Sequence, residues 1–251
     1  MRSLRRTGET LYRDLVGAGE LPLRLLADLD RFVWDDATMK IDWALSAPVP
    51  WLDRGVGRAG TVHLGTDLDG LSRFATELTL GEMPTQPPLL AGQMTTADPA
   101  RSPAGTESIW VYTHLPKRDR WMADEIDTQF KRIEATMEKH APGFVDLVVG
   151  RQVAGPQDFE AENPSRVGGT INGGTAAAYQ QLFFRPVPGL GRADTPIDRL
   201  YLASSSAHPG GAVHGAPGAN AARAALVRNR PVLGSAYRAS VAAAHRAIYR
   251  A

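Results

Sequence analysis

Apolar and polar side chains alternate along residues 39–46, Met-Lys-Ile-Asp-Trp-Ala-Leu-Ser, and this alternation is typical of a half-buried β-strand. Four more short apolar segments predict further strands, at residues 60–65, 89–94, 108–115 and 144–153. Helices and loops separate these segments without regular β–α–β alternation. The order favours an α+β fold built on an antiparallel sheet, with one strand–helix unit appended.

Apolar residues at helical spacing predict the helices. Residues 9–33 read as one or two amphipathic helices, and Thr66-Asp67-Leu68-Asp69 resembles a weak capping box that opens another. The clearest helix covers residues 120–140, and Pro142-Gly143 ends it. A last helix, rich in alanine and with a basic face, covers residues 235–249.

The segment 200–226 combines an apolar strand pattern at residues 200–203, a glycine-rich turn at residues 209–218, and a helix. Pro217 suits the first turn of that helix, where a missing N–H costs nothing. Glycines let the backbone approach a ligand closely, and a helix N-terminus offers N–H groups and partial positive charge. The pattern suits a phosphate or a flavin ring, and it equally suits an ordinary strand–loop–helix connection.

Composition narrows the function classes. The chain has 251 residues, of which 43% are hydrophobic and 22% charged, as in an ordinary globular protein. The net charge of +1 gives no reason to expect nucleic acid as a partner, and no apolar run is long enough for a transmembrane segment. The absence of cysteine excludes disulfides and thiolate chemistry. We therefore expect a soluble, cytoplasmic protein.

The usual catalytic and metal-binding motifs are missing from the sequence. Gly55-Val56-Gly57-Arg58-Ala59-Gly60 matches a dinucleotide fingerprint by letter, but no apolar strand precedes it and no helix follows. The six histidines lack metal-ligand spacing, so no metal site is predicted. No serine lies in a G-x-S-x-G elbow. These observations leave the glycine-rich turn as the main candidate for chemistry.

Residues 200–226 closely resemble the C-terminal flavin-contacting motif of the phytoene desaturase-like FAD-dependent oxidoreductases. That family includes the carotenoid desaturases and the pyridine nucleotide-disulfide oxidoreductase domain-containing protein 2 group. The resemblance extends through further segments, namely residues 32–51, 59–65, 111–116, 156–160 and 168–188. It therefore covers most of residues 20–230.

The resemblance implies a domain organisation. Family members begin with a β–α–β unit that holds the ADP moiety of FAD, and no such unit precedes residue 32 here. The chain is expected to be a partial or split form that works with a partner chain carrying that unit, or as a homo-oligomer. The implied parts are a helical segment (1–35), a substrate-binding domain (36–198), a strand–turn–helix of an FAD/NAD(P)-binding domain (199–230) and a C-terminal helix (231–251).

The resemblance also implies the site residues. The FAD-contacting positions would be Ser204, Pro209, Gly210, Gly211, Val213, Gly215, Gly218 and Asn220. His208 would be the candidate catalytic side chain, and Trp43, Trp110 and Tyr112 would line a cavity for an apolar small molecule. The chain departs from the family pattern at Ser204, Ala212 and Thr175, where the family commonly has glycine, glycine and aspartate.

Two function hypotheses follow from these residues. The first is an FAD-dependent oxidoreductase, of desaturase or dehydrogenase type, that takes hydride from a C–C bond of an apolar substrate. The alternative is a cofactor-free binding or interaction protein derived from the same family. The side chain of Ser204, placed where backbone would approach a flavin, favours the alternative.

Overall fold

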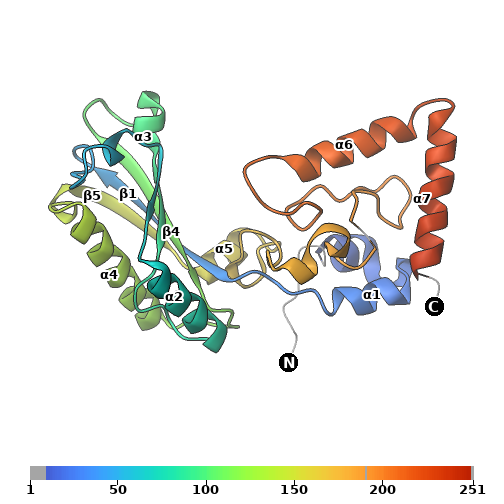
Figure 1. Cartoon of the computed structure of the whole chain (residues 1–251), viewed down its shortest axis with the longest axis horizontal. Coiled ribbons are helices and arrows are strands. Elements are labelled where there is room, and N and C mark those ends of the chain that lie inside the picture. The colour runs from blue at the N-terminus through green and yellow to red at the C-terminus, as the bar shows by residue number, and fades with distance from the viewer. Residues whose placement is uncertain (1–9, 190, 250–251) are drawn as a thin grey trace. The chain divides into compact units, whose positions relative to one another are not determined.

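The computed structural model describes residues 10–189 and 191–249, which form two compact units (Figure 1). The first, here called the sheet unit, is Asp36–Glu162. The second, called the loop unit, combines the described residues before Asp36 with those after Glu162. Each unit has its own apolar core, so each is described by itself.

The sheet unit is built on a five-stranded antiparallel sheet of order β2-β3-β4-β1-β5. Its strands are β1 (Ala37–Leu45), β2 (Thr61–Leu64), β3 (Leu89–Gln93), β4 (Glu107–Leu115) and β5 (Val148–Ala154). The five predicted strands are confirmed, with ends shifted by a few residues. The mixed helix-and-sheet class is also confirmed.

Helix α4 (Ala123–His140) covers one face of the sheet (Figure 1) and closes the main core. Alternation along the strands sends every second side chain to this face, and Phe130, Ile133 and Met137 of α4 meet them. Trp43 lies at the centre, 1% exposed, with its ring against Phe130. Phe130, Ile133 and Met137 recur at helical spacing in the sequence, so one face of α4 meets the sheet.

Both ends of α4 are held by its own carboxylates. Glu125 accepts hydrogen bonds from the Met122 backbone N–H (2.9 Å) and from Arg118, and these bonds lower its pKa. Near the other end, Glu138 accepts from the backbone N–H groups of Gly143 and Val145, which lowers its pKa as well. These contacts satisfy backbone donors that a bare helix end would leave open.

Three shorter helices complete the sheet unit: α2 (Leu68–Leu80), α3 (Met94–Ala97) and α5 (Pro156–Glu162). Helix α2 begins at Asp67, whose carboxylate accepts from the Gly70 N–H at 2.9 Å, and ends at Gly81 in the left-handed region. The capping signal was predicted one residue too early, at Thr66. An aspartate at the N-cap explains why the helix starts there.

The loop unit contains α1 (Leu23–Leu29), α6 (Ala216–Arg228), α7 (Leu233–Tyr249) and a helical turn at Thr10–Gly17. The strand predicted at residues 200–203 is wrong. Tyr201 makes a single antiparallel bridge to Asp194, and no strand is assigned among the described residues of this unit. The Leu200 carbonyl accepts from the Thr195 N–H within this bridge and also from the Thr195 hydroxyl, and the pairing extends no further along the chain.

The boundary between units falls at Glu162, earlier than residue 198, where the resemblance placed the end of a substrate domain. Residues 163–198 pack within the loop unit. Val33 exchanges two hydrogen bonds with the Gln180 side chain, each 2.8 Å, and Val187 joins the cluster around Leu25. Among the residues that the structure describes, no helix is long and apolar enough to span a membrane.

Candidate functional site

The face of the sheet opposite α4 carries a row of aromatic side chains on β4. Trp110 and Tyr112 stack with ring centroids 5.8 Å apart and planes 15° apart, and His114 meets Tyr112 edge-on at 5.9 Å. These residues alternate with Ile109, Val111 and the other core residues of β4, so the pleat turns them to the open face. All three are partly exposed.

A glycine on the neighbouring strand makes room for this row. Gly92 of β3 lies opposite Trp110, and a Cβ at residue 92 would come within 2.2 Å of the indole ring. The Trp110 ring N–H points to the Met94 sulfur, 2.9 Å away. The indole is therefore held in place over β3 by neighbours on both sides.

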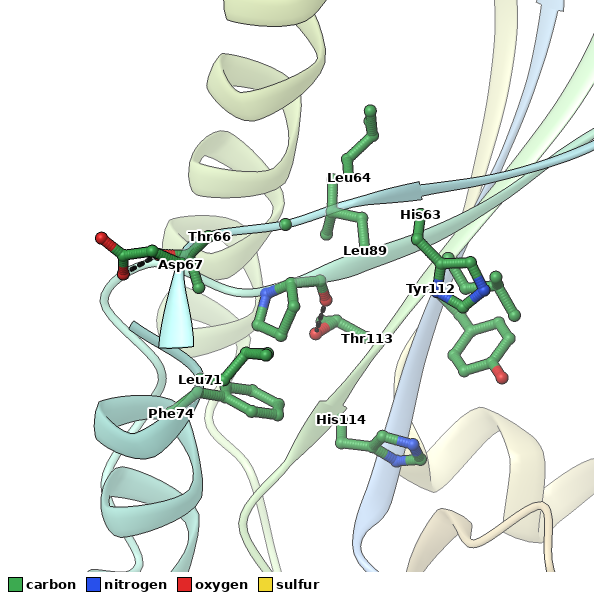
Figure 2. Close-up of a pocket in the computed structure, with 13 residues that line it drawn as sticks. His63, Leu64, Thr66, Asp67, Leu71, Phe74, Leu89, Tyr112, Thr113 and His114 are labelled. Atoms are coloured by element: carbon green, nitrogen blue, oxygen red, sulfur yellow. Dashed lines mark hydrogen bonds between the residues drawn. The ribbon is translucent and has the colours of Figure 1, made fainter. Parts of the chain in front are cut away.

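A groove of about 710 Å³ lies beside this row (Figure 2). Its walls come from β2, β3, β4 and α2, and they comprise His63, Leu64, Gly65, Thr66, Asp67, Leu71, Phe74, Pro88, Leu89, Leu90, Tyr112, Thr113 and His114. The volume lies in the range of small-molecule sites, and apolar and polar side chains contribute about equally to the lining. Figure 2 shows His63, Tyr112 and His114 on one side and Leu71 and Phe74 on the other.

The polar groups of the groove have distinct surroundings. The Thr113 hydroxyl donates to the Pro88 carbonyl at 2.7 Å and fixes the loop before β3. The Nδ1 atom of His114 is buried and has no hydrogen-bond partner in the described part of the chain. No group of three His, Cys, Asp or Glu side chains suited to a metal ion occurs among the described residues.

Trp43 does not join Trp110 and Tyr112. It belongs to the odd-numbered positions of β1 that face α4, and its ring meets Phe144 edge-on at 5.1 Å in the closed core. The alternation of the strand decides this, because residue 43 and the open-face residues 40 and 42 point to opposite sides. The structure therefore groups Trp110 and Tyr112 and leaves Trp43 in the core.

The glycine-rich turn in the loop unit packs on one side against Arg185 and Asn172 of the same unit. Gly210 adopts a φ of +105°, and a Cβ there would approach Arg185 Nε to 3.3 Å. A Cβ on Gly211 would approach Asn172 Oδ1 to 3.1 Å. The turn therefore has an internal reason for both glycines, independent of any ligand.

Arg185 holds this turn to the segment around Gly174. The side chain is fully buried and donates to the carbonyls of Ser205, Thr175, Asn172 and Gly174 at 2.7–3.3 Å. Burial lowers its pKa, and the charge of Asp35 offsets part of that effect. Charge-assisted hydrogen bonds to carbonyls offset the cost of burying a guanidinium, which stays charged.

The beginning of α6 is open, in contrast to the base of the turn. Val213 is fully exposed, and Gly215, with a φ of +60°, is the N-cap. The Ala216 N–H donates to the His214 ring at 2.9 Å. No described atom lies within 4 Å of the Cβ position of Gly218, so the fold does not require glycine there. An exposed helix start of this kind fits a negatively charged or electron-rich group.

The remaining predicted contact residues take structural positions. Ser204 is exposed and accepts from the Ser206 N–H at 3.2 Å, while Pro209 is exposed at the surface of the turn. The Asn220 side chain donates to the His208 carbonyl at 3.5 Å. Nδ1 of His208 is buried without a hydrogen-bond partner among the described residues. Asn220 thus ties the start of α6 to the turn.

Sequence reasoning missed His63, Phe74, His114 and Arg185. The alternation of β4 contained a signal for His114, since residues 110, 112 and 114 must share a face. His63 on β2 and Phe74 on α2 lie far from β4 in sequence, and no local pattern joins them to Tyr112 and His114. Arg185 lies in an irregular loop where periodicity says nothing.

Comparisons with known proteins bear on this arrangement. No protein-family model matches the chain. Over 172 residues the chain is 33% identical to the "Pyridine nucleotide-disulfide oxidoreductase domain-containing protein 2" of Rattus norvegicus and, equally, of Mus musculus. The match covers 64% of this chain and 29% of each relative, so the chain spans less than a third of the length of these curated relatives. The resemblance to that group is confirmed, and the likeness to phytoene desaturases stays a prediction.

Proposed function

We propose that this chain is part of an FAD-dependent oxidoreductase that takes hydride from a C–C bond of an apolar substrate. The similarity to two proteins named for a pyridine nucleotide-disulfide oxidoreductase domain supports the reaction class. In this proposal the groove of the sheet unit holds the substrate, and the turn and the start of α6 contact the flavin.

The groove is the observation that carries the proposal. It offers about 710 Å³ beside the stacked Trp110 and Tyr112 rings, between apolar walls from β3 and α2. Such a site excludes water from an apolar ligand and positions it by shape.

The start of α6 would meet the flavin. A bound flavin would accept the hydride and carry the redox chemistry. Val213, Gly215 and Gly218 would form the contact surface, and the helix start would favour negative charge near it. Gly210 and Gly211 would act indirectly by shaping the turn against Arg185 and Asn172.

The ADP part of FAD needs a further binding unit. The described sheet is antiparallel throughout, so residues 10–189 and 191–249 contain no parallel β–α–β unit with a phosphate-binding turn. The proposal therefore places that unit outside the described residues, in a partner chain or elsewhere in the assembly. We assign no general acid or base. His208, next to the glycine-rich turn, remains the candidate catalytic side chain.

Titration with flavin tests the proposal. The purified chain is mixed with FAD or riboflavin, and flavin fluorescence and visible absorbance are recorded. We expect quenching and a shifted flavin spectrum for the wild-type chain. A chain that leaves both flavins unchanged at high protein concentration would contradict the proposal.

Gly218→Ala separates flavin contact from folding. Because the Cβ position is open and the residue lies in a helix, the change should raise stability by about 0.5–1 kcal/mol. It should also weaken flavin quenching several-fold, since the new methyl group meets the bound ring. Gly57→Ala, at another exposed glycine in the sheet unit, is the control and should leave quenching unchanged.

The alternative is a cofactor-free binding protein, favoured by the filled space behind Gly210 and Gly211. Arg185 and Asn172 already occupy that side of the turn. In that case flavin titration fails while an apolar fluorescent probe still binds the groove. The two titrations together decide between the two functions.

A further inference from the structure

We propose that the groove binds a long-chain carboxylate, with its head group at the His63–Tyr112–His114 end, and that Phe74 limits the chain length it accepts. This inference rests on the proposed function for its view of the groove as a substrate site. It goes further by naming the substrate class and the residue that selects among its members.

Phe74 stands between two cavities. The groove of about 710 Å³ has a neighbour of about 570 Å³, and Phe74 lines both. The second cavity is lined by Asp36, Phe74, Ala75, Leu78, Thr79, Leu80, Gly81 and Lys117. Both follow helix α2, whose 13 residues extend about 20 Å. An elongated ligand fits this arrangement better than a compact one.

Helix α2 is anchored by hydrogen bonds near both of its ends, and its apolar side chains between these anchors line the groove. At the first end, Asp67 caps it. Toward the last turn, Glu77 is buried and its carboxylate accepts from the Thr85 hydroxyl (2.6 Å) and N–H (3.2 Å). Leu71, between these anchors, remains 45% exposed although it faces the groove. Helix α2 therefore forms one wall of the groove, and its side chains Leu71 and Phe74 line that wall.

The opposite end of the groove gathers hydrogen-bond donors. Strand register places Tyr112, Leu90 and His63 in one row across β4, β3 and β2. His114 stands next to Tyr112 on the same face, and its Nδ1 is buried without a partner in the described chain. Figure 2 shows the three polar rings on the side of the groove away from Leu71 and Phe74. A head group above Leu90 would be within reach of all three.

A carboxylate suits these donors better than an alcohol. Two imidazoles and a phenol can each donate a hydrogen bond, and a carboxylate can accept several at once. Lys40 lies opposite Tyr112 in the register and is paired with Asp42 at 2.6 Å, so the pair adds no net charge beside the head group. Asp67, the acid in the groove wall, already accepts from the Gly70 N–H. At the far end, Lys117 and Asp36 form their own pair, 3.6 Å apart, so no second charge is needed there.

Displacement of a fluorescent tetraene fatty acid measures the chain-length limit. Octanoate, dodecanoate and hexadecanoate compete for the groove of the wild-type chain, of Phe74→Ala and of Leu68→Ala. Each extra buried CH₂ strengthens binding about fourfold until the chain reaches Phe74. We expect the affinity of the wild-type chain to level off as the fatty acid lengthens. In Phe74→Ala the affinity should keep rising with chain length, and hexadecanoate should bind at least about tenfold more tightly than it does to the wild-type chain.

Leu68→Ala is the matched control, because Leu68 lies on the same helix, is 78% exposed and lines neither cavity. It should follow the wild-type length profile. Equal profiles for all three proteins would overturn the role of Phe74. Circular dichroism of each variant verifies the fold, and Phe74→Leu should give an intermediate profile if side-chain size is the cause.

A comparison of dodecanoate with dodecanol tests the head group. The wild-type chain should prefer the carboxylate about tenfold, and His63→Phe with His114→Phe should abolish that preference while dodecanol still binds. Equal affinity for both ligands in the wild-type chain would overturn the carboxylate assignment. The displacement assay contains no flavin. Fatty-acid binding can therefore succeed even if the flavin titration fails, so the failure of this inference and the failure of the proposed function are distinguishable.

Discussion

The indole ring of Trp110 fills space over strand β3 that a larger residue at position 92 would occupy. Three atoms of the ring lie within 2.5 Å of the Cβ position of Gly92. The ring then stacks on Tyr112, which lines the groove. A single glycine on one strand thus determines the aromatic surface on the next.

Gly92→Ala should displace Trp110 and disturb the groove. Overpacking of this kind costs about 1–3 kcal/mol, measured as a lower free energy of unfolding in urea. The same variant should show a shifted Trp fluorescence spectrum. Gly150→Ala on β5 is the control, because no described atom lies within 4 Å of its Cβ position. If both variants lose equal stability, the contact with Trp110 is not the cause.

At the scale of single elements, helix periodicity was the most informative signal. Residues 120–140 and 235–249 became α4 and α7 with ends shifted by a few residues, since an amphipathic helix finds its core through its own repeating face. The apolar run at residues 200–203 failed because a strand needs a partner strand. Local sequence cannot supply that partner.

Helix α7 also carries a half-buried histidine whose protonation opposes folding. His245 lies with Val241 and Ala242 on the face toward the loop of residues 194–201. Burial lowers its pKa below the ordinary value near 6.5, an effect that Arg192 reinforces and Asp194 partly reverses. The unfolded chain therefore binds a proton at a higher pH than the folded chain does.

The sign of the pH effect follows from that difference. The contribution of neutral His245 to the free energy of unfolding is fully present above about pH 6.5. It decreases as the pH drops toward the lower pKa that His245 has in the folded chain. His245→Phe should therefore lose less stability than the wild-type chain between neutral and mildly acidic pH. Urea unfolding at both pH values measures this. An equally steep loss in the variant would exclude His245 as the source.

At the scale of the whole molecule, the sheet unit is one continuous segment of the chain. The loop unit combines the segments that come before and after it. The segment Asp36–Glu162 enters and leaves the sheet at the same end, because Lys40 near the start of β1 pairs with Ala154 at the end of β5. A segment inserted through two neighbouring ends commonly folds by itself.

Residues 36–162 expressed alone should therefore fold. Far-UV circular dichroism should show mixed helix and sheet, and urea should unfold the fragment in one cooperative transition. A fragment of residues 36–198 should be trimmed by protease toward residue 162, since its extra segment lacks its packing partners. A fragment 36–162 without a cooperative transition would contradict the division into units.

The sequence by itself determined the helices that became α2, α4, α6 and α7 and the five strands of the sheet, because periodicities of 3.6 and 2 follow from backbone geometry. It also contained the likeness to a group of oxidoreductase-domain proteins. Only the tertiary structure decided which aromatic residues share a face with α2, where the first unit ends, and that Arg185 lies behind the glycine turn. Those facts depend on contacts between residues far apart along the chain, which no local pattern encodes.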